Sequence, residues 1–250
     1  MNTDIVSAIE LTASAAITVA ALSSLLPTLR ARTSALLLFG LWFIAVGLFG
    51  AIQLFGPRHL GPPGLGLSVM LPILALTGSA TMHPALRVRI REAPLTLLIA
   101  MNALRVLGVS FLILLGEGRI SPTFALSAGW GDIAVGFAAV PVALLARRRS
   151  PLSVGVVAVW NTLGLLDLVT AVALGVMSAA GTPLNFIHEA PGSGVMTTLP
   201  YLFIPGFLVP IFATSHLLVY YKLKHRAWGT HTSIAPEPAE GIPLNSRQGA

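Results

Sequence analysis

The sequence predicts an all-α, polytopic membrane protein with seven transmembrane helices, because of its composition, the length of its apolar stretches and the placement of its basic residues. Of its 250 residues, 55% are apolar and 10% are charged, whereas about 25% of the residues in a soluble domain are charged. A helix needs roughly 20 apolar residues to cross a hydrocarbon core about 30 Å thick. The stretches that meet this requirement lie at residues 5–26, 35–55, 66–83, 95–115, 123–146, 152–177 and 199–221.

The first stretch is predicted to be a retained transmembrane helix and not a cleaved signal peptide. It is preceded by an acidic residue, Asp4, and by no basic residue, whereas a secretory signal begins with a positively charged region. Its basic flank, Arg30 and Arg32, follows it. Because basic residues favour the cytoplasmic side, the amino terminus is expected outside.

Glycine and proline distinguish two of the other stretches. The third, 66–83, is the shortest and contains Gly66, Pro72 and Gly78, which predict a kinked or partly re-entrant segment. The seventh contains three prolines, each of which lacks an amide hydrogen and frees a backbone carbonyl, so this helix is predicted to be kinked. These prolines are Pro200, Pro205 and Pro210.

The connections between the stretches differ in charge on the two sides of the membrane. One side contains Arg58 and Arg119, and the other contains most of the basic residues. This asymmetry predicts an external amino terminus and a cytoplasmic carboxyl terminus, in a multi-pass protein of the bacterial inner (plasma) membrane. It also accounts for the net charge of +6 without a nucleic-acid partner. The basic residues of the cytoplasmic side are Arg30, Arg32, Arg87, Arg89, Arg91, Arg147, Arg148, Arg149, Lys222, Lys224 and Arg226.

Two segments outside the stretches have the composition of loops. Residues 227–250 are rich in proline and poor in apolar residues, which predicts a disordered cytoplasmic tail after a transmembrane domain of residues 1–226. Residues 178–198 connect the sixth and seventh stretches on the outside, as a plain loop or a lid. The chain has no cysteine, which excludes disulfides, thiolate metal sites and cysteine nucleophiles.

Three ionisable residues, Arg105, Asp132 and Asp167, lie inside the fourth, fifth and sixth stretches. Each would cost about 2.5–3.5 kcal/mol at the centre of a span, so we expect them to be paired. Arg105 and Asp132 lie near the middle of their stretches and Asp167 slightly outward of it, which makes contact possible. Two amide side chains, Asn102 and Asn161, lie close to them along the chain.

Small residues flank Asp132 at helical spacing, which allows this face of the helix to approach a neighbouring helix closely and to bury the carboxylate. If one arginine meets two aspartates, one carboxylate is expected to hold a proton or to be hydrated. Such a site suits the transport of protons or of a small solute, although a purely structural network has the same composition. The small residues are Ala125, Gly129, Gly136 and Ala139.

Two histidines form a second group of candidate residues. His83 ends the third stretch, and His216 lies near the end of the seventh, about one turn from the cytoplasmic face. Histidines at a shared depth are able to ligate a haem or a metal ion. The alternative is that both are interfacial residues without a ligand, so the sequence leaves the cofactor open.

Short motifs resemble two known families. Residues 129–132, Gly-Trp-Gly-Asp, resemble the GxGD signature of intramembrane aspartyl proteases, which use two membrane aspartates to activate water. In those families the other aspartate precedes the signature, whereas here Asp167 follows it. The Pro-Ala-Leu tripeptide of the same families occurs at 84–86, but before the signature and at a membrane edge. Residues 72–75 and 210–213 resemble each other, as in the 3+1+3 arrangement of SWEET sugar transporters, but the PQ signature of that family is missing.

A longer similarity covers residues 124–132, the pair Trp160-Asn161 and residues 164–167. It resembles uncharacterised bacterial multi-span membrane proteins and implies no known activity. The residues themselves predict an integral membrane protein that binds or transports a small solute or protons, with no catalytic residue indicated. The alternatives are a membrane-embedded enzyme or haem protein and a structural or assembly partner. The predicted site consists of Arg105, Asp132, Asp167, Asn102 and Asn161.

Overall fold

The computed structural model describes residues 2–56 and 58–225, so the predicted tail at 227–250 lies outside the described residues. Within the described ranges the chain is helical without any strand, and seven helical spans are long and apolar enough to cross a membrane. The elements of the spans are α1 (Thr3–Ser24), α2 (Leu29–Ala51), α3 (Gly61–Met82), α5 (Leu95–Ala100), η1 (Met101–Gly108), α6 (Val109–Gly116), α7 (Pro122–Ala146), α8 (Pro151–Met177), η3 (Ile204–Leu208) and α9 (Val209–Lys224).

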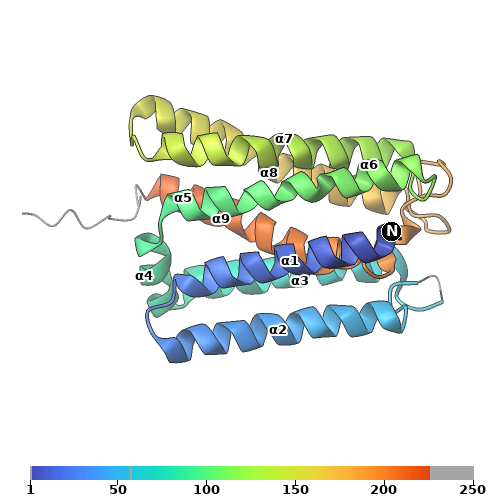
Figure 1. Ribbon diagram of the computed structural model, residues 1–250, viewed down its shortest axis with the longest axis horizontal. Helices are drawn as coiled ribbons and strands as arrows, with labels where there is room; N and C mark the ends of the chain where they lie inside the picture. The colour runs from blue at the N-terminus through green and yellow to red at the C-terminus, as the bar shows by residue number, and fades with distance from the viewer. Residues whose placement is uncertain (1, 57, 226–250) are drawn as a thin grey trace, which may run out of the picture.

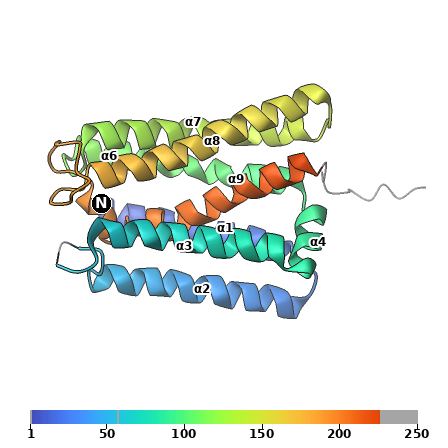
Figure 2. The same ribbon diagram turned by 180° about the vertical axis from the view of Figure 1, so that it is seen from behind.

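The spans lie side by side in one bundle (Figures 1 and 2). In both views α2 forms one edge and the α7 and α8 pair forms the other, with the α5-η1-α6 span and α9 between them. The central spans are the most buried, whereas only 11% of the span residues of α2 and of α3 are buried. Large apolar side chains such as Leu41 and Leu71 are therefore exposed along these outer helices, where a lipid bilayer would accept them.

Most of the basic residues belong to segments that lie at one end of the bundle (Figure 1). This end, called the basic end below, contains the α1–α2 turn, the short helix α4 (Pro84–Glu92), the α7–α8 turn and the end of α9. The opposite end, called the amino-terminal end, contains the start of α1, the α2–α3 and α6–α7 connections and the long connection after α8.

Local signals in the sequence explain where several helices start. Proline occupies the first position of α7 and α8, where its missing amide hydrogen leaves no helical hydrogen bond unmade. The Ser150 hydroxyl accepts a hydrogen bond from the Ser153 amide at 3.2 Å and caps α8. In the same way, the Thr28 hydroxyl accepts from the Ala31 amide at 3.2 Å and caps α2.

Four features differ from the sequence-based expectation. The third span is one continuous α-helix that contains Pro72 and is long enough to cross a membrane, and not a re-entrant segment. The seventh span starts at Ile204, so Pro200 lies before it. The fourth span is interrupted by eight residues of 3₁₀-helix, η1. The amphipathic helix α4 was not expected, because its arginines suggested a simple loop.

The small residues of α7 form its contact with η1. Ala125, Gly129, Gly136 and Ala139 are all buried. A Cβ atom added at Gly136 would lie 2.6 Å from the backbone nitrogen of Val106, so only glycine permits this approach. The stripe therefore brings the backbones of α7 and η1 together, and Asp132 lies on the same face.

Gly136→Ala tests this close approach. The added methyl group would have to push η1 away from α7, so we expect the free energy of unfolding to fall by about 1–3 kcal/mol. Thermal unfolding in detergent measures the change. Gly155→Ala is the matched control, because a Cβ at Gly155 meets no atom of the described residues within 4 Å. Equal stability of the two variants would contradict the packing described here.

Candidate functional site

The interrupted span places Arg105 in the centre of the bundle. Arg105 lies ten residues after Leu95, the start of a span that ends at Gly116, which corresponds to a depth of about 15 Å. Its side chain is 1% exposed. Runs of 3₁₀-helix longer than three or four residues are uncommon, and η1, which carries both Asn102 and Arg105, has eight. The span is therefore irregular where its polar residues lie.

The guanidinium of Arg105 donates hydrogen bonds to two carboxylates. Its Nε donates to Asp132 Oδ1 at 2.7 Å, and its NH2 group donates to Asp167 Oδ2. Its NH1 group donates to the backbone carbonyl of Gly164 at 3.0 Å. Because Asp132 is on α7 and Asp167 on α8, one cation ties the fourth, fifth and sixth spans together.

His216, from α9, is the fourth member of this group. Its Nε2 lies 3.1 Å from Arg105 NH1, and its Nδ1 lies 2.8 Å from Asn161 Oδ1. The Asn161 amide group donates to the backbone carbonyl of His216 at 3.0 Å, which leaves its Oδ1 to accept. His216 is thus a neutral imidazole that donates from Nδ1 to Asn161 and accepts at Nε2 from Arg105. We call Arg105, Asp132, Asp167, His216 and Asn161 the central cluster.

Three glycines give the side chains of the central cluster room. A Cβ at Gly108 would collide with the Asp132 side chain, one at Gly131 with the Asp167 carboxylate, and one at Gly164 with the His216 ring. Gly108 belongs to η1, Gly131 to α7 and Gly164 to α8. Each glycine therefore admits a polar side chain from a neighbouring element.

Asn102 connects η1 to α9 beside the central cluster. Its amide group donates to the backbone carbonyl of Leu98 at 2.9 Å and to Ser215 Oγ at 3.0 Å. Ser215 in turn donates to the carbonyl of Phe212 at 2.7 Å. Asn102 Oδ1 is buried and has no hydrogen-bond partner among the described residues. Asn102 is thus linked to Ser215, the residue before His216, and its described hydrogen bonds include neither carboxylate.

The charges of the central cluster do not balance if both carboxylates are ionised. Arg105 contributes one positive charge, and His216 is neutral because Nε2 accepts from Arg105. Two ionised aspartates would leave one net negative charge in the interior of the bundle. An uncompensated charge in the bundle interior is costly, so the arrangement is balanced when the two carboxylates together hold one proton.

The two histidines predicted as a pair occupy different environments. His83 is an exposed residue at the end of α3. His216 is fully buried, and both of its ring nitrogens face protein partners. No group of three or more metal-ligating side chains was found among residues 2–56 and 58–225. The geometry therefore favours a hydrogen-bonding role for His216 over ligation of a metal or a haem.

The sequence missed the true position of His216. Helix α9 continues to Lys224, three residues beyond the predicted end, so His216 lies deeper than one turn. The π-helical segment η3 and Pro210 precede His216 in the same span. A usable signal was present, because Thr214, Ser215 and His216 form a polar run inside an otherwise apolar span.

Comparison with known proteins gives a family. Residues 62–224 match a family described as "Domain of unknown function (DUF8737)", a range that is well over half of the chain and contains the whole central cluster. The chain belongs to this family. The match confirms that the chain belongs to an uncharacterised family, and it does not test the short motifs. No curated protein and no solved structure matches the chain.

Arg105→Met tests whether the central cluster acts as one unit. Removal of the cation leaves two buried carboxylates without a partner, so we expect the free energy of unfolding to fall by about 3–5 kcal/mol. In the triple variant Arg105→Met, Asp132→Asn, Asp167→Asn most of this loss should be recovered, because no charge remains to be balanced. Thermal unfolding in detergent compares the variants.

Arg119→Met is the control for this experiment. Arg119 pairs with Asp4 at 2.7 Å at the amino-terminal end, where its side chain is 35% exposed. Loss of such a pair changes the free energy of unfolding by at most about 1 kcal/mol. A single Arg105→Met variant as stable as Arg119→Met, or a triple variant less stable than the single one, would contradict the account.

Proposed function

We propose that the protein transfers protons, alone or coupled to a small solute, through the central cluster. In this proposal the protein is a multi-pass protein of the inner membrane, with its amino terminus outside and its basic end in the cytoplasm. The observation that supports the proposal most is the pairing of one arginine with two aspartates in the bundle interior, since this combination is neutral when it holds one exchangeable proton.

The exposure of the charged side chains supports a proton-carrying role. Asp132 and Asp167 are 16% and 14% exposed, whereas Arg105 is 1% exposed. The carboxylates are thus reachable from outside the cluster, while the cation is enclosed. A fixed charge that is enclosed and a protonatable group that is accessible are the two parts that a proton relay needs.

The backbone around the cluster supports the same proposal. Arg105 lies in a 3₁₀ segment, and His216 follows a π-helical segment in the last span. Irregular segments of this kind inside helices often mark sites of movement. Movement of η1 relative to α7 would change the distances from the Arg105 guanidinium to the Asp132 and Asp167 carboxylates. The proton affinity of each carboxylate would change with its distance from the cation.

A proton, and not a larger substrate, fits the immediate surroundings of Arg105. Each nitrogen of the guanidinium already donates to a protein group. The cavity described below is lined by other residues. A solute coupled to the proton would therefore bind beside the central cluster and not at the guanidinium itself.

Proton flux into liposomes tests the proposal. Liposomes that contain the purified protein and a pH-sensitive dye receive an imposed membrane potential, and the initial rate of internal pH change is recorded. We expect the wild-type protein to carry protons and the Asp132→Asn and Asp167→Asn variants to fall to the rate of protein-free liposomes, because neither retains a pair that shares a proton.

Glu92→Gln is the control variant for the flux measurement. Glu92 is an exposed carboxylate at the basic end, paired with Arg89 at 2.8 Å, and its neutralisation should leave the rate unchanged. Flux that survives both aspartate substitutions, or wild-type liposomes no faster than protein-free ones, would contradict the proposal and favour a structural role for the cluster.

A further inference from the structure

A cavity of about 420 Å³ lies near the amino-terminal end of the bundle, and no residue of the central cluster lines it. It is bordered by the first turns of α3, the last turns of α8, the connection that follows α8 and the start of the last span. This volume falls in the range of roughly 300–1,000 Å³ that is usual for small-molecule sites. The cavity is therefore large enough for a ligand.

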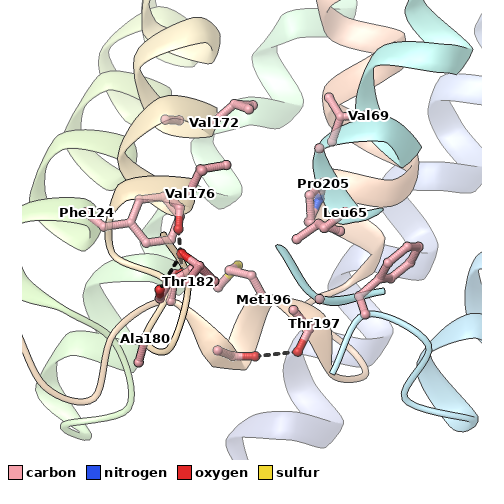
Figure 3. A pocket seen from close by; sticks show the side chains of 18 of the residues that line it. Leu65, Val69, Phe124, Val172, Val176, Ala180, Thr182, Met196, Thr197 and Pro205 are labelled. Carbon is pink, nitrogen blue, oxygen red and sulfur yellow. Dashed lines mark hydrogen bonds between the residues drawn. The ribbon is translucent and has the colours of Figure 1, made fainter. Parts of the chain in front are cut away.

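The lining of the cavity is apolar on facing walls. Figure 3 shows Val172 and Val176 of α8 on one side, and Val69 and Leu65 of α3 facing them across the cavity. Phe124 of α7 closes the same side as α8. An apolar interior of this size accepts hydrocarbon and offers little to a charged ligand.

Hydroxyl groups lie at one end of the cavity. Thr182, Ser193 and Thr197 belong to the connection between α8 and the last span and line the cavity from that side. Each hydroxyl donates to a backbone carbonyl, so its oxygen can accept a hydrogen bond from a ligand. In Figure 3, Thr182, Met196 and Thr197 lie at the loop end, while Val172 and Val69 lie at the far end. The cavity thus has a polar end beside the bundle surface and an apolar end that runs inward.

The connection that forms the polar end is held in place by hydrogen bonds. The amide and the hydroxyl of Thr123 donate to the Glu189 carboxylate at 2.8 and 2.6 Å, and these bonds lower the pKa of Glu189 from its ordinary value. The Ser193 hydroxyl donates to the Gly175 carbonyl at 2.6 Å. Because the Glu189 pKa is lowered, its contact is complete at neutral pH and weakens as the pH falls below the usual range of a glutamate.

The helices beside the cavity expose apolar side chains to the outside. Leu67 and Met70 on α3 are 60% and 52% exposed, and Val169 on α8 is 57% exposed. Helices α3 and α8 also pack against each other much less closely than α7 packs against α8. In a bilayer, hydrocarbon chains would lie against these exposed side chains of both helices.

From the shape, polarity and position of this cavity, we propose that it binds one hydrocarbon chain of an amphiphile. The chain lies between α3 and α8, and the polar head of the amphiphile lies against the hydroxyls of the loop end. The same chemistry is offered by a free fatty acid and by one acyl chain of a phospholipid, and the experiment below separates these two sources. The proposal does not depend on proton transfer at the central cluster.

Gly66→Leu tests the proposal by filling the cavity. Gly66 lines the cavity, and a Cβ added there meets no atom of the described residues within 4 Å, so the longer side chain extends without a clash at its base. Gly78→Leu is the matched control on the same helix, since a Cβ at Gly78 also meets no described atom and Gly78 is not among the lining residues. Ala180→Leu fills the cavity from the loop side and provides a second test.

Binding is measured with cis-parinaric acid, a fatty acid whose polyene chain fluoresces in an apolar site. Protein held in amphipol without added lipid is titrated with this acid and, in a second arm, with a phosphatidylcholine that carries the same chain. We expect saturable binding to wild type and to Gly78→Leu, and a loss of affinity of at least about tenfold in Gly66→Leu and Ala180→Leu. Thermal unfolding checks that each variant is folded.

The two arms identify the source of the chain. Binding of the free acid alone assigns the cavity to a single-chain amphiphile, and binding of the phosphatidylcholine assigns it to a membrane lipid; both outcomes support the proposal. Absence of saturable binding of either probe to wild type would overturn it. Unchanged affinity in folded Gly66→Leu and Ala180→Leu proteins would also overturn it.

Discussion

The pairing of Arg105 with Asp132 and Asp167 is the interaction on which the interior of this bundle depends. A guanidinium that is 1% exposed at the middle of a span has to find its partners within the protein. It finds them on α7, on α8 and on α9, through two carboxylates, one backbone carbonyl and one imidazole. Four spans are therefore held by a single side chain, and their positions relative to one another follow from its geometry.

Close backbone packing and polar contacts reinforce each other in this half of the bundle. The glycines of α7 allow η1 to approach, and the approach brings Arg105 within reach of Asp132. Gly131 and Gly164 then leave space for Asp167 and His216. In the other half, the outer helices α2 and α3 bury only 11% of their span residues. The protein thus combines a closely packed polar centre with outer helices that border an apolar cavity.

Much of the fold could be predicted from the sequence, because length and apolar content decide where a helix crosses a bilayer. The fifth and sixth spans were predicted to within one residue of α7 and α8, since proline marks their starts and arginine or serine their ends. The 3₁₀ segment could not be predicted, because Met101–Gly108 has no proline to signal a departure from the α-helix. Helix α4 was missed because it is amphipathic and too short to span a bilayer.

The candidate site was only partly visible in the sequence. Arg105, Asp132 and Asp167 attract attention because charges are costly inside spans, and the structure brings the three together. His216 was grouped with His83 and not with the charged residues. The end of a helix is poorly defined in a sequence, and a shift of a few residues changes the predicted depth of a side chain. The carbonyl of Gly164 carries no sequence signal, since every residue has one.

The central claim is that the two aspartates share one proton at neutral pH, and infrared spectroscopy tests it most directly. A protonated carboxylic acid has a C=O stretching band that an ionised carboxylate lacks. The account predicts this band in the wild-type protein and its loss in either Asp132→Asn or Asp167→Asn, because the remaining carboxylate then balances Arg105 alone. Absence of the band from wild type, or its persistence when both aspartates are replaced, would contradict the account.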